Sequence, residues 1–154
     1  MKRLGYGLAA VVFIIDQLVK YWIVAIVRLP ERGFIDVLPV FRLTYVENIG
    51  VSMGLLMANS ELARWGLVAV TAGIAGGVAV WILRERQRAD IIALGLVLGG
   101  ALGNIVDRIR FGYVIDFLHF FWGEHNFWVF NVADAAISLG VVMLLLRALK
   151  SPTA

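Results

Sequence analysis

The sequence contains no cysteine, few charged residues and only two histidines, and each shortage removes a class of function. Without cysteine the chain has no disulfide, no thiolate metal site and no cysteine nucleophile. His119 and His125 are six residues apart, whereas a helical zinc site needs histidines at i and i+4. No other His or Glu cluster has the spacing of metal ligands, so we expect neither a metal nor another cofactor.

Charged residues make up 16% of the 154 positions and hydrophobic residues 61%, and the mean hydropathy is +0.87. A globular domain is nearer about half apolar and about a quarter charged, so this composition indicates an integral membrane protein. We expect one domain, residues 1–154, of the all-α membrane class. Its four predicted transmembrane helices cover about residues 4–27, 62–83, 91–109 and 127–146.

Basic residues gather in the short segments at the ends of these spans: Lys2, Arg3, the RERQR of residues 84–88, Arg147 and Lys150. With four crossings, all of them fall on one side of the membrane, and the positive-inside rule makes that side cytoplasmic. Both termini are then cytoplasmic, and residues 28–61 and 110–126 face the other compartment. We interpret the net charge of +3 as this orientation signal and expect no nucleic-acid partner.

The segment after the first span is rich in β-branched and aromatic residues. Residues 34–38 and 40–46 form two such runs separated by Pro39, which predicts short strands within an outer β segment of about residues 33–58. Aromatic side chains favour the headgroup level of a bilayer, so this segment is expected on the outer leaflet.

Glycines recur at helical spacing in the third predicted span. Gly95, Gly99 and Gly103 share one face, and such a ridge of small residues lets a neighbouring helix approach closely. The glycines of the second span receive the same interpretation: Gly73, Gly76 and Gly77.

Polar side chains inside the spans are the candidates for function, because a bilayer rejects them. Asp16 and Lys20 are four residues apart and can pair, either to tie the first helix to its neighbours or to orient a substrate or headgroup. Asn104, Asp107 and Arg108 form a polar face at the outer end of the third span. We expect Asp107 and Arg108 to hold the outer connection against the helix ends.

Asp116 and Asp134 are both expected at the outer membrane surface, one among apolar neighbours and one at the start of the last span. Two carboxylates in a low-dielectric site do not easily ionise together, so one keeps a proton, as an aspartic protease requires. Structural interpretations remain open: Asp134 as a first-turn acid of a helix and Asp116 as a loop acid bonded to backbone.

Two rival functions also remain open. Residues 50–54 match G-x-S-x-G, and although a four-span chain has no room for the usual sheet, Ser52 could pair with His119 or His125. Alternatively, a small non-enzymatic transport or scaffold subunit could use its aspartates as a proton relay, although a relay should string acids through the bilayer.

Five short stretches occur in order along nearly the whole chain: DQLVK (16–20), NIGVSMG (48–54), GGALGNIVDR (99–108), VIDF (114–117) and FNVAD (130–134). Together they resemble the bacterial lipoprotein signal peptidase family, also called signal peptidase II. One departure is Met53, where an aromatic residue is common in the family, and it bears only on fine substrate contacts.

The resemblance implies an aspartic endopeptidase with Asp116 and Asp134 as the catalytic pair. Its substrate would be a prolipoprotein, cut just before a cysteine that already carries diacylglycerol. It also implies an inner-membrane protein with the site near the periplasmic face, a small β-cradle between the first two helices, and a lid-like connection before the fourth. Membrane lipids are the other expected partner, and no obligate protein partner is inferred.

Other residues match family positions that line or support the site: Asn48, Gly50, Asn104, Asp107, Arg108 and Asn131. Asp16 and Lys20 match a polar pair of the first helix that the family uses for activity or folding. Apolar neighbours are expected to wall the cleft: Val114, Phe117, Val132 and Ile137.

Overall fold

The computed structural model describes residues 1–50 and 61–150. Within them, four helices are long and apolar enough to cross a membrane, which confirms the four predicted spans. They are α1 (Lys2–Tyr21) continued by the π-helical turn η1 (Trp22–Ile26), α3 (Glu61–Arg84), α4 (Arg88–Phe111) and α5 (Val132–Lys150).

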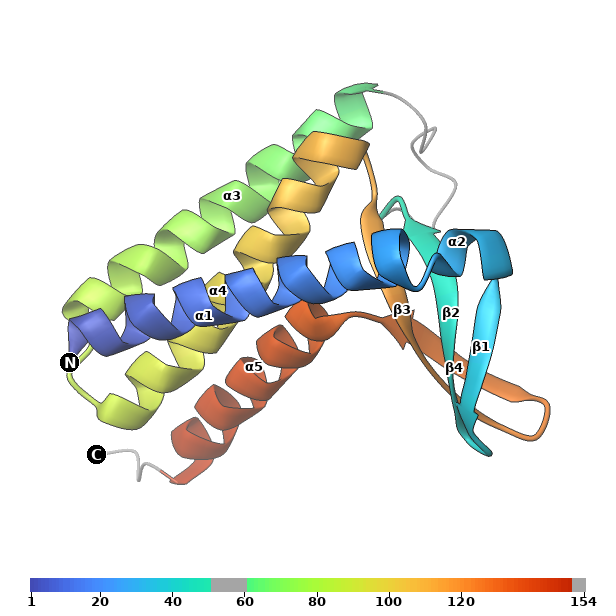
Figure 1. Ribbon diagram of the computed structural model, residues 1–154. Helices are drawn as coiled ribbons and strands as arrows, with labels where there is room; N and C mark the ends of the chain where they lie inside the picture. Colours follow the sequence, from blue (N-terminus) through green and yellow to red (C-terminus); the bar gives the residue numbers. More distant parts are fainter. Residues whose placement is uncertain (51–60, 151–154) are drawn as a thin grey trace.

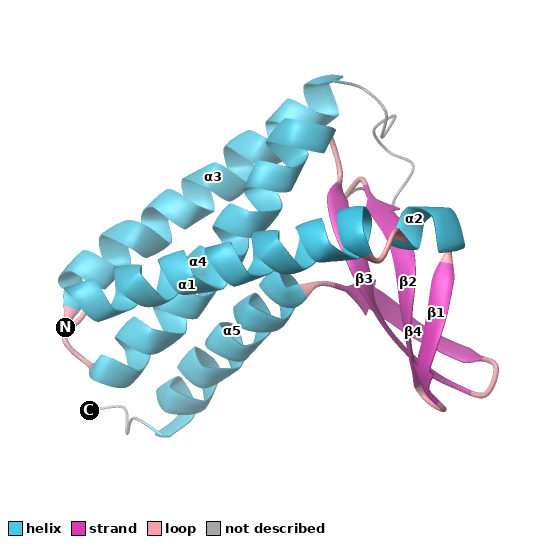
Figure 2. Ribbon diagram, viewed as in Figure 1, coloured by secondary structure: helices cyan, strands magenta, loops and turns pink. Residues whose placement is uncertain are grey.

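A short helix and four strands occupy the other end of the molecule (Figure 2). They are α2 (Leu29–Arg32), β1 (Phe34–Leu38), β2 (Phe41–Asn48), β3 (Val114–Trp122) and β4 (His125–Phe130). The strands form one antiparallel sheet in the order β1-β2-β3-β4. The protein is therefore mostly helical, with a small sheet built from two separate connections.

The sheet requires two corrections to the sequence prediction. The predicted β-cradle between the first two helices is present, but residues 114–130, where a lid-like connection had been expected, supply the other half of the sheet. The fourth helix begins at Val132 and not at residue 127, because residues 127–130 end β4. An aromatic, apolar run has the same hydropathy in a strand as in a span, so hydropathy alone extended the helix too far. The predicted β segment at 33–58 contains β1 and β2, and its residues 51–58 lie outside the described ranges.

The ends of the helices agree with the predicted sidedness. The start of α1, the α3–α4 connection and the end of α5 lie at one end of the bundle, and the sheet lies at the other (Figure 1). The basic segments around Lys2, residues 84–88 and Arg147 therefore share one end, as four crossings require.

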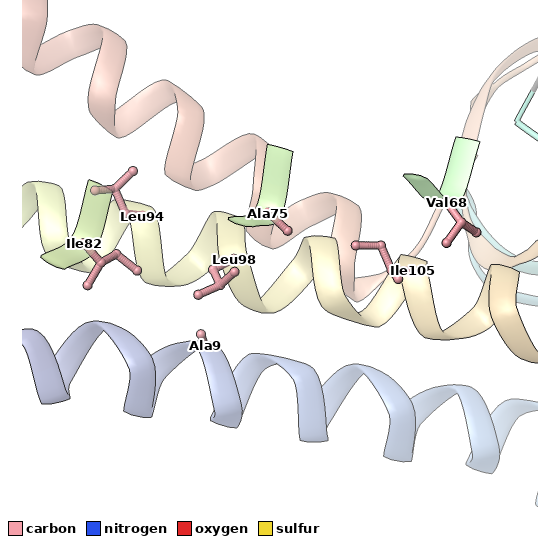
Figure 3. Packing of buried hydrophobic residues seen from close by; sticks show 7 residues of the cluster. All are labelled: Ala9, Val68, Ala75, Ile82, Leu94, Leu98 and Ile105. Atoms are coloured by element: carbon pink, nitrogen blue, oxygen red, sulfur yellow. The ribbon is translucent and has the colours of Figure 1, made fainter. Parts of the chain in front are cut away.

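Helix α4 lies at the centre of the bundle. In its apolar window 61% of the residues are buried, against 28%, 17% and 11% in the spans of α1, α3 and α5. Buried side chains of α1 and α3 meet it along its length (Figure 3): Ala9, Val68, Ala75 and Ile82 against Leu94, Leu98 and Ile105.

The glycine ridge of α4 packs against α1, as predicted. A Cβ on Gly95 would lie 2.7 Å from the carbonyl oxygen of Gly5, and one on Gly99 would lie 2.5 Å from that of Ala9. At Gly103 a Cβ would overlap the Asp16 carboxylate. The same interpretation is wrong for the glycines of α3, where an added Cβ meets nothing within 4 Å among the described residues: Gly73, Gly76 and Gly77.

A second cluster of buried side chains joins the outer end of the bundle to the sheet. Ile23 of η1 and Leu29 of α2 pack with Ile115 and Phe117 of β3. Because neighbouring residues of a strand face opposite ways, Asp116 is turned away from this cluster and toward α5. The packing thus fixes the position of β3 relative to the helices.

Candidate active site

Asp116 is buried in the sheet, with a side chain that is 1% exposed. Its two carboxylate oxygens accept hydrogen bonds from the amide groups of Asn131 (2.7 Å) and Asn48 (2.9 Å). Burial and, to a smaller extent, the nearby Asp134 raise the pKa of Asp116 to about 6, although the hydrogen bonds from Asn48 and Asn131 oppose the shift. The position is on strand β3, which differs from the loop acid considered from sequence.

Asp134 lies in the first turn of α5 and contributes to the start of that helix. Its backbone N–H donates to Oδ1 of Asn131 (2.9 Å), and the Asn131 N–H donates to Oδ2 of Asp134 (3.2 Å). This reciprocal pair is a capping box. The remaining oxygen, Oδ1, accepts a hydrogen bond from Nδ2 of Asn104 on α4 (2.8 Å). Asp134 is therefore a first-turn acid that also faces the polar centre of the molecule.

Asn131 connects the two aspartates. The side chain is fully buried, and its amide nitrogen contacts Oδ1 of Asp116 while its amide oxygen receives the N–H of Asp134. The same nitrogen also contacts the Asn104 side-chain oxygen at 3.2 Å. One asparagine at the junction of β4 and α5 thereby holds a strand carboxylate and a helix carboxylate in one hydrogen-bonded group.

A cavity of about 900 Å³ opens onto both carboxylates. Asn48 and Gly50 line it on one side, and Ser138 of α5 lines it farther along. Its apolar walls come mainly from the sheet: Val46, Ile49, Trp128, Val129 and Phe130.

These walls differ from the predicted ones. Val114 and Phe117 are 1% and 2% exposed and belong to the packed interior, and neither Val132 nor Ile137 lines the cavity. Alternation along β3 explains the difference for Phe117, which directly follows Asp116 and faces the opposite side of the strand, but it does not account for Val114, two residues before Asp116. Trp128 lines the cavity but was absent from the prediction, and its position in a segment assigned to a helix concealed it.

Gly50 adopts a backbone conformation that favours glycine, with φ +81°. Its N–H donates to Oδ1 of Asn48 (2.8 Å), so the turn and the Asn48 contact to Asp116 belong together. A Cβ at Gly50 would lie 2.6 Å from the Leu67 side chain and 3.3 Å from the Arg108 guanidinium. Ser52 and Met53 lie outside the described residues.

Arg108 supplies positive charge next to the two aspartates. Its guanidinium interacts electrostatically with Asp134, Asp116 and Asp107, and its Nε has no hydrogen-bond partner among the described residues. The outer end of α4 is instead held by Arg64, which donates to the carbonyl oxygens of Arg108 (2.8 Å) and Ile109 (2.6 Å). The sequence had assigned the holding of the outer connection to Asp107 and Arg108, and Asp107 does contact that connection by accepting the N–H of Ile115 on β3 (3.2 Å).

Asp107 belongs to a buried ionic group beneath the cavity. The predicted pair of Asp16 and Lys20 is present, with Nζ 2.8 Å from Oδ2 of Asp16, and Nζ is also 2.7 Å from Oδ2 of Asp107. Gln17, which the sequence analysis passed over, donates to Asp107 at 3.0 Å and to Asp16 at 3.2 Å. The sequence signal for this role was the presence of a polar glutamine inside an apolar span.

Both histidines lie on the sheet. His119 is buried and its Nδ1 lies 2.9 Å from the Thr44 hydroxyl, whereas His125 is exposed at the start of β4. Within residues 1–50 and 61–150, no group of three or more His, Cys, Asp or Glu side chains could hold a metal ion. The described residues place two hydrogen-bonded carboxylates and an amide partner, Asn48, at the cavity, which Glu47 also lines, and the Arg108 guanidinium interacts with both carboxylates.

Comparisons with known proteins agree on one family. The family model described as signal peptidase (SPase) II matches residues 8–150. The lipoprotein signal peptidase of Rhizorhabdus wittichii strain RW1 is 57% identical over 149 residues, which cover 96% of this chain and 87% of that protein. That of Sphingopyxis alaskensis is 47% identical over 148 residues, covering 96% of this chain and 86% of the relative.

A solved structure of a bacterial membrane enzyme has the same fold. It superposes with a TM-score of 0.81 at 28% sequence identity, and the match covers 96% of this chain and 93% of that one. The four spans and the small sheet are thus shared with an experimentally determined structure.

Proposed function

The chain belongs to the signal peptidase II family, whose members are aspartic-type lipoprotein signal peptidases, and from its site we propose that Asp116 and Asp134 form the catalytic pair. The observation that carries this proposal is the group centred on Asn131, which contacts both residues beside one cavity. Membership of a peptidase family argues against the proton-relay subunit, and the aspartic type of that family argues against a serine mechanism through Ser52.

The proposed reaction needs one proton shared by two carboxyl groups. The ionised carboxylate takes a proton from water as the water oxygen bonds to the scissile carbonyl carbon, and the protonated partner gives its proton to the carbonyl oxygen. The resulting diol collapses: the first carboxyl passes its proton to the leaving nitrogen, and the second recovers one from a diol hydroxyl. The dyad then carries a single proton again. The pKa of Asp116, which burial and the charge of Asp134 both raise, supports this sharing, because carboxyl groups that interact electrostatically titrate as a unit.

The amide groups of Asn48, Asn104 and Asn131 support the pair in complementary ways. Each donates a hydrogen bond to one carboxylate oxygen, which fixes the direction of the remaining lone pairs. Such preorganised donors cost no rearrangement during the reaction. Arg108 adds a positive charge beside the two carboxyl groups, where negative charge develops on the scissile carbonyl oxygen.

The proposed substrate is a prolipoprotein cut just before its diacylglyceryl-modified cysteine. A signal helix in the bilayer and a lipid-bearing cysteine are both largely apolar, which suits walls formed by Trp128, Phe130 and Val46. The orientation that fits has the end with Lys2 and Arg147 in the cytoplasm and the cavity at the periplasmic face of the inner membrane.

The proposal is tested by Asp116→Asn and Asp134→Asn in purified enzyme, assayed by the gel shift of a diacylglyceryl-modified precursor. Each variant should remain folded and lose processing almost completely, because an amide neither accepts nor supplies the proton. Asp36→Asn is the matched control, since its carboxylate is 64% exposed on β1 and lies outside this cavity. Processing at the wild-type rate by either site variant would exclude the dyad.

A further inference from the structure

The side chain of Lys20 is 3% exposed, and its ammonium group is linked to Asp134 through the side chain of Asn104. It contacts Asp16 at 2.8 Å, Asp107 at 2.7 Å and the side-chain oxygen of Asn104 at 3.3 Å. An isolated buried ammonium is costly, and here two carboxylates and an amide oxygen surround it. These partners explain how the buried positive charge of Lys20 is tolerated. The other hydrogen bonds that the same three side chains make indicate a further role for Lys20.

Each carboxylate paired with Lys20 also holds the backbone next to one catalytic aspartate. Oδ1 of Asp16 accepts the N–H of Ala133 (2.9 Å), and Oδ2 of Asp107 accepts the N–H of Ile115 (3.2 Å). Ala133 directly precedes Asp134, and Ile115 directly precedes Asp116. Through Asp16 and Asp107, the ammonium group is therefore linked to two backbone hydrogen bonds, one at the first turn of α5 and one on strand β3.

A third connection runs through a side chain. The side-chain oxygen of Asn104 accepts a hydrogen bond from Lys20, and its side-chain nitrogen donates one to Oδ1 of Asp134 (2.8 Å). The contact with Lys20 thus fixes which end of the Asn104 amide faces Asp134. Without the lysine, the amide could turn its oxygen toward the carboxylate, and the pair would repel.

The charged groups around Lys20 come from each element that packs against it. They are Asp16 on its own helix, Asp107 and Arg108 on α4, Asp116 on β3 and, through Asn104, Asp134 on α5. The positive charge of Lys20 also favours ionised Asp116. Geometry and charge therefore act on the same pair of carboxyl groups.

We propose that Lys20 is the positioning residue of the active site: through Asp16, Asp107 and Asn104 it sets the separation of Asp116 and Asp134 and hence how they share a proton. This inference rests on the proposed function of the two aspartates. It assigns Lys20 a task in the reaction beyond neutralising buried acids, and that task is exerted through the residues that Lys20 contacts.

The test measures kcat, KM and the pH profile of processing by the purified full chain in lipid nanodiscs. Lys20→Arg keeps the charge with a different shape, so kcat should fall on the order of 10²-fold with little change in KM and little change in the pH profile. Lys20→Met also removes the charge, so both limbs of the kcat profile should move to higher pH by roughly 0.5–1 unit. The double variant Asp16→Asn/Lys20→Met preserves the net buried charge, so if the single variant does not fold, the double variant should show the fall in kcat with little change in the pH profile.

Arg147→Met is the matched control. It removes an ion pair with Asp90 between α5 and α4 at the opposite end of the bundle, so it should alter stability without moving the pH profile. The inference would be overturned if the Lys20 variants had the wild-type kcat and pH profile per folded molecule. It would also be overturned if none of the three variants folded, because that result would assign Lys20 to folding alone. Asp116→Asn, run in parallel, separates this outcome from failure of the dyad itself.

Discussion

Replacing Gly99 by alanine should loosen the contact between α1 and α4. The new Cβ would lie 2.5 Å from the carbonyl oxygen of Ala9, about 0.9 Å short of the 3.4 Å at which ordinary contact begins, and 2.7 Å from the Cβ of Val12. A backbone carbonyl in a helix has no rotamer to adopt, so the two helices must separate. Overpacking of this kind costs about 1–3 kcal/mol of the free energy of unfolding.

The assay is thermal unfolding in one detergent, with Gly76→Ala as the matched control. A Cβ at Gly76 meets nothing within 4 Å among the described residues, so that variant should gain up to about 1 kcal/mol from the higher helix propensity of alanine. The two glycine-to-alanine changes therefore have opposite signs. Equal midpoints for the wild type and Gly99→Ala, or equal losses in both variants, would refute the close packing of α1 on α4.

Two further predictions concern the dyad. Asn131→Ala removes the contact to Asp116 and the cap of α5. It should lower the free energy of unfolding by about 1 kcal/mol and reduce the rate of processing on the order of 10²-fold. A loss of stability without a loss of processing would contradict the bridging role. The pKa of Asp116 is raised from 3.8 to about 6, so its contribution to stability is complete below pH about 4 and is lost as the pH rises through about 6. Denaturant unfolding at several pH values should show a loss of about 3 kcal/mol between these limits in the wild type and not in Asp116→Asn.

The sequence predicted the parts of the fold that depend on local composition. Four spans follow from apolar length, and the strands β1 and β2 follow from β-branched runs around Pro39. Residues 127–130 were assigned to a helix because their hydropathy suits a span, and only pairing with β3 makes them a strand. That pairing joins residues on both sides of a turn at Gly123, whose φ is +58°.

The candidate site was predictable as a set of residues and not as a set of contacts. The spacing of Asp16 and Lys20 gave their pairing, because i and i+4 share a helix face. The partner of Asp107 depends on how α1 and α4 are rotated, which spacing within α4 does not contain. The same limit explains why the glycines at 95–103 and those at 73–77 had the same interpretation although only the first set meets a neighbour.

The hydrogen bond from Ala133 to Asp16 has a consequence for how the enzyme comes into being. It joins the first membrane helix to the beginning of the last, 117 residues later in the chain. A nascent chain that has inserted only α1, α3 and α4 holds Asp16, Lys20 and Asn104 but has no Asp134. Under the proposed mechanism such a chain lacks one of the two catalytic carboxyl groups, so proteolysis requires insertion of the last helix.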